Sequence, residues 1–388
     1  MPQAHGRQLV AVVLLGLALS TALVVASVWR QSPRCCPGEE PYISLYNRSL
    51  SHVESVLVHG DGQAFAALAQ DPSLAHPAVI GSSIEYAYRA QRPLWSYVAW
   101  IGSGGQPELV PWVLAALAAA SGAIATWVMA LLLLRRRVSP WWALLVVLVG
   151  VRAIMSFTPE LAAFAFLGAG LLCWSARRDG WAVAALCCAA VTRESMLVGV
   201  IALAAWELTR RPRTRTASRR VAALGLPFAA YGLWVGFLFV RLGALPYGTS
   251  SSLGPASAAR LGIPGTGLAA ALRHGSNPTG VLAGAMAAAL VTVVAVAVAR
   301  DDLLTWITVA FAGFASLLGS VVWTTDGLVR TLLPLYALGG AAILGGCAQI
   351  VRRRAEAGAG AEPVGSLAGA TSSAASPTLG PSGRPVRS

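Results

Sequence analysis

Ten apolar runs with few charged residues constrain this chain more than any other feature. The first runs from Gln8 to Trp29. The others lie at about 108–134, 140–157, 160–176, 180–192, 195–209, 221–241, 279–299, 303–322 and 331–350. A helix of about 20 apolar residues crosses the roughly 30 Å hydrocarbon core of a bilayer. The pattern therefore predicts an all-α polytopic membrane protein of about 10 transmembrane helices, some of them short.

The composition agrees with a membrane protein and argues against other classes. Of the 388 residues, 56% are hydrophobic and 12% are charged, whereas about 25% of the residues in a soluble domain are charged. A soluble enzyme and a disordered chain are therefore excluded. The first apolar run is longer than the core of a signal peptide, so we expect it to be retained as a helix.

The net charge of +13 comes from 29 basic residues, all of them Arg. On a soluble domain such a charge would suggest nucleic-acid binding, but in membrane proteins basic connections mark the cytoplasmic side. With ten spans threaded in order, the cytoplasmic side carries 18 Arg against 6 acidic residues, and the remaining positions carry 11 against 10. The charge thus indicates orientation, with both termini cytoplasmic and no nucleic-acid partner.

This topology divides the chain into a transmembrane domain, residues 1–354, and a tail, residues 355–388. The tail is rich in Gly, Ala, Ser and Pro, so we expect it to be disordered and cytoplasmic. Two long loops, 30–107 and 242–278, lie on the outer side. In the first of them, Pro93 to Ile101 is predicted to form a short interfacial helix.

A carboxylate in the first outer loop is a candidate catalytic base. Asp61 stands between Gly60 and Gly62, and glycines allow a tight turn that leaves a side chain approachable. An aspartate with an ordinary pKa of about 4 is ionised at neutral pH and can accept a proton. An ordinary Asp-Gly turn in a solvated loop would give the same pattern.

Arginines on the outer side are candidates to bind phosphate, because the planar guanidinium donates two parallel hydrogen bonds to phosphate oxygens. The candidates are Arg89, Arg92, Arg193, Arg241, Arg260, Arg273 and Arg330, with His274 beside one of them. Arg193 and Arg330 stand at predicted helix ends. Arg89 and Arg92 suit a second role as interface anchors, and the loop with Arg273 either closes over a lipid or is simply solvated.

Two glutamates lie close to these arginines. Glu160 begins a span, where it either stabilises the helix N-terminus or orients an acceptor or an Arg. Glu194 follows Arg193, so an ion pair of Arg193 with Glu194 or Glu160 is an alternative to phosphate binding. Arg152 lies inside an apolar run, and we expect a buried pair with Glu160.

Three sequence motifs resemble, in the same order along the chain, motifs of the bacterial membrane glycosyltransferases of the GT-C superfamily, in particular the GT87-like and cell-surface-glycopolymer group. They are Asp61-Gly62-Gln63 with Phe65, Ala69 and Asp71-Pro72, continuing in Tyr88-Arg89-Ala90-Gln91-Arg92-Pro93-Leu94-Trp95; then Val191-Thr192-Arg193-Glu194-Ser195; and Arg330-Thr331-Leu332-Leu333-Pro334-Leu335-Tyr336. All three fall on the predicted outer side.

The resemblance implies a GT-C-like bundle with a long first extracytoplasmic loop, in the plasma membrane. It implies inverting transfer of a sugar from a polyprenyl-phosphate donor to a cell-envelope glycan or lipid acceptor, with Asp61 as general base. Taken with the chemistry of the outer residues described above, it gives Arg89, Arg92, Glu160, Arg193, Glu194, Arg273, His274 and Arg330 as the expected substrate-binding residues. The chain departs from the group's pattern at Ala66 and at Ser96-Tyr97, which leaves the sugar and the lipid open.

No metal or other cofactor is expected. Some GT-C relatives use a divalent ion, but the first outer loop has no Asp-x-Asp pair, so we predict metal independence. The competing hypotheses are a lipid or polyisoprenoid transporter or flippase, and a scaffold without catalysis. A transporter usually places polar groups near the bilayer midplane and shows internal repeats, whereas here the polar residues gather on one side.

The predicted orientation can be tested with reporters at the C-terminus. We expect a green fluorescent protein fused after Ser388 to fluoresce, because its chain would fold in the cytoplasm, and an alkaline phosphatase at the same position to be inactive. An active phosphatase together with a non-fluorescent fusion would contradict the prediction and place the C-terminus on the outer side.

Overall fold

The computed structural model describes residues 2–30, 52–58, 62–75, 83–210, 215–246, 263–275, 277–319, 323 and 330–359. The chain divides into two units, residues 1–348 and 349–388, and the first of them is considered below. Every described element is a helix, and no strand occurs among these residues.

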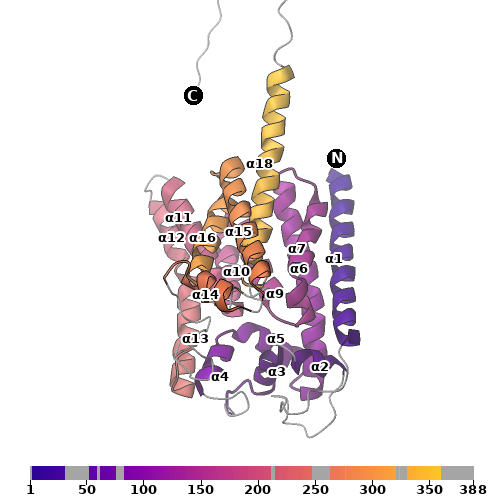
Figure 1. The fold of residues 1–388 in the computed structure, drawn as a ribbon, viewed down its shortest axis with the longest axis vertical. Helices are drawn as coiled ribbons and strands as arrows, with labels where there is room; N and C mark the ends of the chain where they lie inside the picture. Colours follow the sequence, from indigo (N-terminus) through magenta and orange to yellow (C-terminus); the bar gives the residue numbers. More distant parts are fainter. Residues whose placement is uncertain are drawn as a thin grey trace, which may run out of the picture. The chain divides into compact units, whose positions relative to one another are not determined.

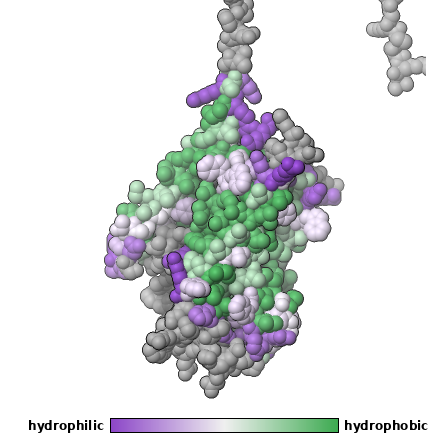
Figure 2. Space-filling view, turned by 90° about the vertical axis from the view of Figure 1, so that its right-hand side faces the viewer, coloured by the Kyte–Doolittle hydropathy of each residue, from purple (hydrophilic) through white to green (hydrophobic). Residues whose placement is uncertain are grey.

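Five long helices are apolar enough to cross a membrane. The helical stretches concerned are Gly6–Arg30, Pro107–Arg135, Ser218–Leu242, Pro278–Ala299 and Leu333–Ala357, of which the second and third each join two helical elements. In Figure 2 a broad apolar surface covers the middle of one face of the molecule. These features indicate an α-helical multi-pass membrane protein; the figure of about ten spans stays a prediction.

The helix bounds follow the apolar runs closely. The long helices are α1 (Pro2–Arg30), α6 (Val110–Arg135), α13 (Leu226–Leu242), α15 (Pro278–Ala299) and α18 (Leu333–Ala359). Shorter apolar helices are α9 (Glu160–Ser175), α10 (Asp179–Thr192), α11 (Leu197–Arg210) and α16 (Leu303–Leu317). Two short helices are more polar, α12 (Arg215–Ala223) and α14 (Thr266–His274). Because α18 continues to Ala359, the first residues of the expected disordered tail are helical; residues 360–388 lie outside the described part.

The predicted span 140–157 is wrong as a single helix. It consists of a 3-10 turn, η3 (Pro140–Leu144), followed by α7 (Leu145–Val149) and α8 (Val151–Met155). The break between the last two falls at Gly150, where a Cβ atom would lie within 2.7 Å of the Leu161 side chain. The helix is thus interrupted where Gly150 packs closely against the start of α9.

The segment predicted as the first outer loop forms a layer of short helices, hereafter the outer layer, at one end of the bundle (Figure 1). The layer contains α2 (His52–Val58), α3 (Gly62–Gln70), α4 (Ser83–Ala90) and α5 (Pro93–Gly102). Helix α5 confirms a helix over the predicted range, and its interfacial position stays a prediction. Pro93 occupies the first turn, where its missing N–H costs nothing. A 3-10 turn, η2 (Pro107–Leu109), leads from this layer into α6.

Helices α9, α10 and α11 are short for membrane spans. They contain 16, 14 and 14 residues, which at 1.5 Å per residue gives about 21–24 Å, less than the roughly 30 Å hydrocarbon core. Helix α5 contacts α10, and α3 contacts α6. The outer layer therefore packs where the short helices end, and the polar residues at those ends meet it.

Small residues allow the long helices to approach closely. Helix α1 packs along α6, and a Cβ atom on Gly122 would lie 2.0 Å from the Ser20 hydroxyl oxygen. A Cβ atom on Gly168 of α9 would lie 2.4 Å from the Val128 side chain. Such contacts replace the hydrophobic driving force, which is absent between helices in lipid.

This packing predicts the effect of a branched side chain at the α1–α6 contact. We expect Gly122→Val to destabilise the protein by about 1–3 kcal/mol, as overpacking usually does, and to lower the midpoint of thermal unfolding in detergent. Gly236→Val on α13 is the matched control, because no atom lies within 4 Å of its added Cβ. Equal midpoints for the two variants would contradict the packing.

Candidate functional site

A strained turn before α9 positions the candidate glutamate. Phe157 has a φ of 53° and is fully buried. The left-handed conformation is costly for a bulky residue, by about 1–3 kcal/mol. The turn closes by backbone hydrogen bonds from Phe157 to Ile154 (3.2 Å) and from Thr158 to Ala153 (3.0 Å), and the chain then enters α9 at Glu160.

Side chains from two distant helices hold this turn. The Ser27 hydroxyl of α1 donates a hydrogen bond to the Met155 carbonyl over 2.8 Å. The Trp95 indole N–H of α5 donates to the Phe157 carbonyl over 3.0 Å, in a buried environment. The surroundings thus stabilise the left-handed residue, as an outlier of this kind requires.

Helix α3 also reaches the same turn. A Cβ atom on Gly62 would lie 2.6 Å from the Ser156 carbonyl oxygen and 2.8 Å from the Leu57 side chain. Only glycine fits this approach without a shift. Asp61 itself lies outside the described residues, and so does Arg260.

Glu160 accepts hydrogen bonds from two arginines on one oxygen. Arg330 donates from Nε over 2.9 Å and from Nη2 over 2.7 Å to Oε1, and Arg193 donates from Nη1 to the same atom. The second terminal nitrogen of Arg193 contacts the Thr331 hydroxyl at 3.4 Å. Glu160, Arg193 and Arg330, hereafter the Glu160 cluster, thus join the second and third elements of the sequence resemblance.

The Glu160 cluster is buried and carries a net charge of +1. The side chains of Glu160, Arg193 and Arg330 are 1%, 9% and 17% exposed. Among the described residues, Oε2 of Glu160 and Nε of Arg193 are buried without a hydrogen-bond partner. Buried polar atoms are normally satisfied, so the Nε–H of Arg193 is available to donate to a ligand.

Arg92 and Glu194 form a second, bidentate pair beside the cluster. Nε of Arg92 donates to Oε2 over 2.8 Å, and Nη2 donates to Oε1 over 2.7 Å. Burial alone would raise the pKa of Glu194. The Arg92 guanidinium lowers it by more than burial raises it, and the resulting pKa is about 2. Glu194 is therefore ionised throughout the physiological pH range.

Residues 90–97 anchor the outer layer to the bundle. The Tyr231 hydroxyl of α13 donates to the Gln91 side-chain oxygen over 2.9 Å, and the Trp234 indole donates to the Ala90 carbonyl over 2.9 Å. The guanidinium groups of Arg89 and Arg92 lie 5.7 and 5.5 Å from the centre of the Tyr88 ring. Both arginines thus contact Tyr88, and their role as interface anchors stays a prediction.

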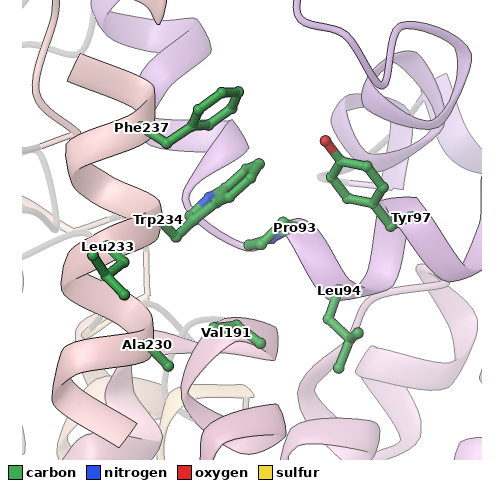
Figure 3. Close-up of a pocket in the computed structure, with 8 residues that line it drawn as sticks. All are labelled: Pro93, Leu94, Tyr97, Val191, Ala230, Leu233, Trp234 and Phe237. Carbon is green, nitrogen blue, oxygen red and sulfur yellow. The ribbon is translucent and has the colours of Figure 1, made fainter. Parts of the chain in front are cut away.

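Two apolar grooves flank Leu94 of α5. The α5–α6 groove has a volume of about 330 Å³ and reaches from Trp95 to Thr192, next to Arg193. The α5–α13 groove has a volume of about 460 Å³, and its walls are residues of α5, α10 and α13 that face a common space (Figure 3). The hydroxyls in the first groove donate to backbone carbonyls of their own helices, so both grooves present hydrocarbon surfaces.

The remaining predicted site residues lie elsewhere. Arg273 and His274 end α14 and are exposed, and no described contact joins them to the Glu160 cluster. The expected buried pair of Arg152 with Glu160 is wrong: Arg152 is exposed, and the described ion pairs of Glu160 are with Arg193 and Arg330. Among the described residues, no group of three or more His, Cys, Asp or Glu side chains could hold a metal ion.

Comparison with known proteins adds no relative. No family model matches the chain, and neither the curated proteins nor the solved structures contain a detectable match.

Sequence reasoning missed the pairing of Arg92 with Glu194 and the role of Trp95. The paired residues are 102 positions apart, and no local pattern links them. The sequence linked Arg92 and Glu194 only indirectly, because each belongs to a motif of the same resemblance.

The cluster predicts a stability effect for Glu160→Gln. The change leaves two buried guanidinium groups without their carboxylate, and breaking a buried pair typically costs about 3–5 kcal/mol. The midpoint of thermal unfolding should fall well below that of the wild type. Glu108→Gln, at an exposed carboxylate, should leave it unchanged; equal midpoints for both variants would refute the pairing.

Proposed function

We propose that this protein is an inverting membrane glycosyltransferase that moves a sugar from a polyprenyl-phosphate donor to a cell-envelope glycan or lipid acceptor. The reaction would take place at the extracytoplasmic face of the plasma membrane, with both termini in the cytoplasm. One observation carries the proposal: Arg193 and Arg330, from two separate elements of the GT-C resemblance, meet at a single buried carboxylate.

The charge of the Glu160 cluster suits such a donor. A polyprenyl-phosphate sugar is a phosphodiester with one negative charge, which would neutralise the net +1 of the cluster. Arginine matches phosphate oxygens geometrically, and the buried Nε of Arg193 has no partner among the described residues. Neutralisation matters because an uncompensated buried charge is costly.

The α5–α6 groove provides a place for the lipid part of the donor. Its lining includes Thr192, the residue before Arg193, so a chain that lies in it would have its phosphate close to the cluster in the proposed complex. Its mouth includes Ile124 and Trp127, which are about half exposed. A hydrocarbon chain can therefore enter from the surrounding lipid.

The chemical step assigns one role to each group. Asp61 takes the proton of an acceptor hydroxyl, and the oxygen attacks the anomeric carbon from the face opposite the phosphate. The bond between the anomeric carbon and the phosphate oxygen breaks, and polyprenyl phosphate leaves with the bonding electrons. Arg193 and Arg330 stabilise the charge on the leaving phosphate. The approach of Gly62 to Ser156, four residues before Glu160, supports this arrangement.

A lipid transporter or flippase is the alternative, since it too would need an anion site beside an apolar groove. The two functions differ in their need for a base. A transporter moves the lipid without breaking the bond to the sugar, so it requires no residue that accepts a proton from an acceptor.

Asp61→Asn separates these functions. We expect the variant to bind the donor but to transfer its sugar at least about 100-fold more slowly, because general base catalysis contributes about 10²–10⁴-fold. The assay measures transfer from a radiolabelled polyprenyl-phosphate sugar by purified, folded protein, with Glu108→Gln as the control. Full activity of Asp61→Asn, or no transfer by the wild type from any such donor, would disprove the catalytic assignment.

A further inference from the structure

Arg193 lies between two carboxylates that could both pair with it. Glu160 accepts a hydrogen bond from its Nη1, and Glu194 is the next residue along the chain. Both glutamates influence the ionisation of Arg193, and burial disfavours its charge. If Glu194 had no partner of its own, its negative charge would cancel the positive charge that an anionic substrate needs.

Arg92 donates a hydrogen bond to each oxygen of the Glu194 carboxylate. Its Nε and Nη2 take one oxygen of Glu194 each, and the two side chains are 8% and 24% exposed. Parallel bonds of this kind are among the strongest that proteins form. The described hydrogen-bond partners of the Arg193 side chain are then Glu160 and Thr331.

The position of Arg92 is fixed on both sides. The preceding residue, Gln91, accepts from the Tyr231 hydroxyl, and Trp95 on the next turn donates to the Phe157 carbonyl. The Tyr88 ring lies 5.5 Å from its guanidinium carbon. Such supports on neighbouring residues are the usual means of holding a charged group in one orientation.

We propose that Arg92 is a positioning residue, which neutralises Glu194 and so reserves Arg193 for the phosphate of the donor. The inference rests on the proposed function, because it takes the phosphate of a lipid donor as the ligand of the Glu160 cluster. It differs from the role expected from the sequence, in which Arg92 touches the substrate itself.

The charges of the five side chains distinguish these roles. Arg92, Arg193 and Arg330 against Glu160 and Glu194 give a net charge of +1. Arg92→Met lowers it to 0 and frees Glu194 to compete for Arg193. The double variant Arg92→Met/Glu194→Gln returns it to +1 with no free carboxylate. A positioning role therefore predicts rescue by the second substitution, whereas a direct contact of Arg92 with phosphate predicts none.

Binding can be measured without any sugar transfer. Farnesyl phosphate provides an isoprenoid chain with a phosphate, and farnesol is the same chain without it. Isothermal titration calorimetry would use the full-length protein in phosphatidylcholine nanodiscs, which contain no anionic lipid. Arg136→Met is the matched control, because Arg136 forms an equivalent bidentate pair with Asp302, through bonds of 3.1 and 2.7 Å, away from the cluster.

We expect Arg92→Met to bind farnesyl phosphate about tenfold more weakly or worse, since a tenfold change corresponds to only about 1.4 kcal/mol. Arg92→Lys should retain most of the affinity, and the double variant should recover to within about threefold of the wild type. Arg136→Met should bind normally. Farnesol should bind all variants equally.

Two results would overturn the inference while leaving the proposed function intact: wild-type affinity in Arg92→Met, or a double variant as weak as Arg92→Met. If Arg92→Met does not fold, Arg92→Lys decides: a positioning role predicts nearly wild-type affinity, because the charge of Glu194 stays neutralised, and a loss of about tenfold or more would overturn the inference. If the wild type binds farnesyl phosphate no better than farnesol, the phosphate site itself is wrong, and the proposed function falls with the inference.

Discussion

A single carboxylate oxygen, Oε1 of Glu160, receives hydrogen bonds from two arginines of distant segments. This shared atom joins three parts of the chain, the start of α9, the end of α10 and the entrance to α18. Two guanidinium groups cannot be buried side by side without such a partner. Their excess of one positive charge also makes the site suitable for an anion.

The outer layer and the bundle depend on each other through this region. The left-handed turn at Phe157 orients the start of α9, and it is held by Trp95 from α5, Ser27 from α1 and the close approach of Gly62 from α3. Residues of the first outer loop therefore support the cluster from outside the bundle, and the short helices α9, α10 and α11 leave room for them. This explains how residues 102 and 170 positions apart in the chain come into contact.

The sequence predicts the helices well because their signal is local. Apolar runs locate α1, α6, α13 and α15 to within a few residues, and Pro93 marks the start of α5. The break inside 140–157 escapes prediction, because it depends on Leu161 packing against Gly150 and on a phenylalanine in a conformation that residue type does not favour. The pair of Arg193 with Glu160 was one of two alternatives from spacing, while the partners of Arg92 and Arg152 required the tertiary structure. Charged residues choose partners in space, and hydrophobic periodicity carries no information about that choice.

The most direct test of the account is an experimental structure with decaprenyl phosphate bound. We predict that phosphate oxygens lie within about 3 Å of guanidinium nitrogens of Arg193 and Arg330, that the first isoprene units follow the groove from Thr192 toward Trp95, and that Arg92 stays on Glu194. A phosphate bound instead at Arg273 and His274, or at the arginines of the opposite face, with the Glu160 cluster empty, would contradict it.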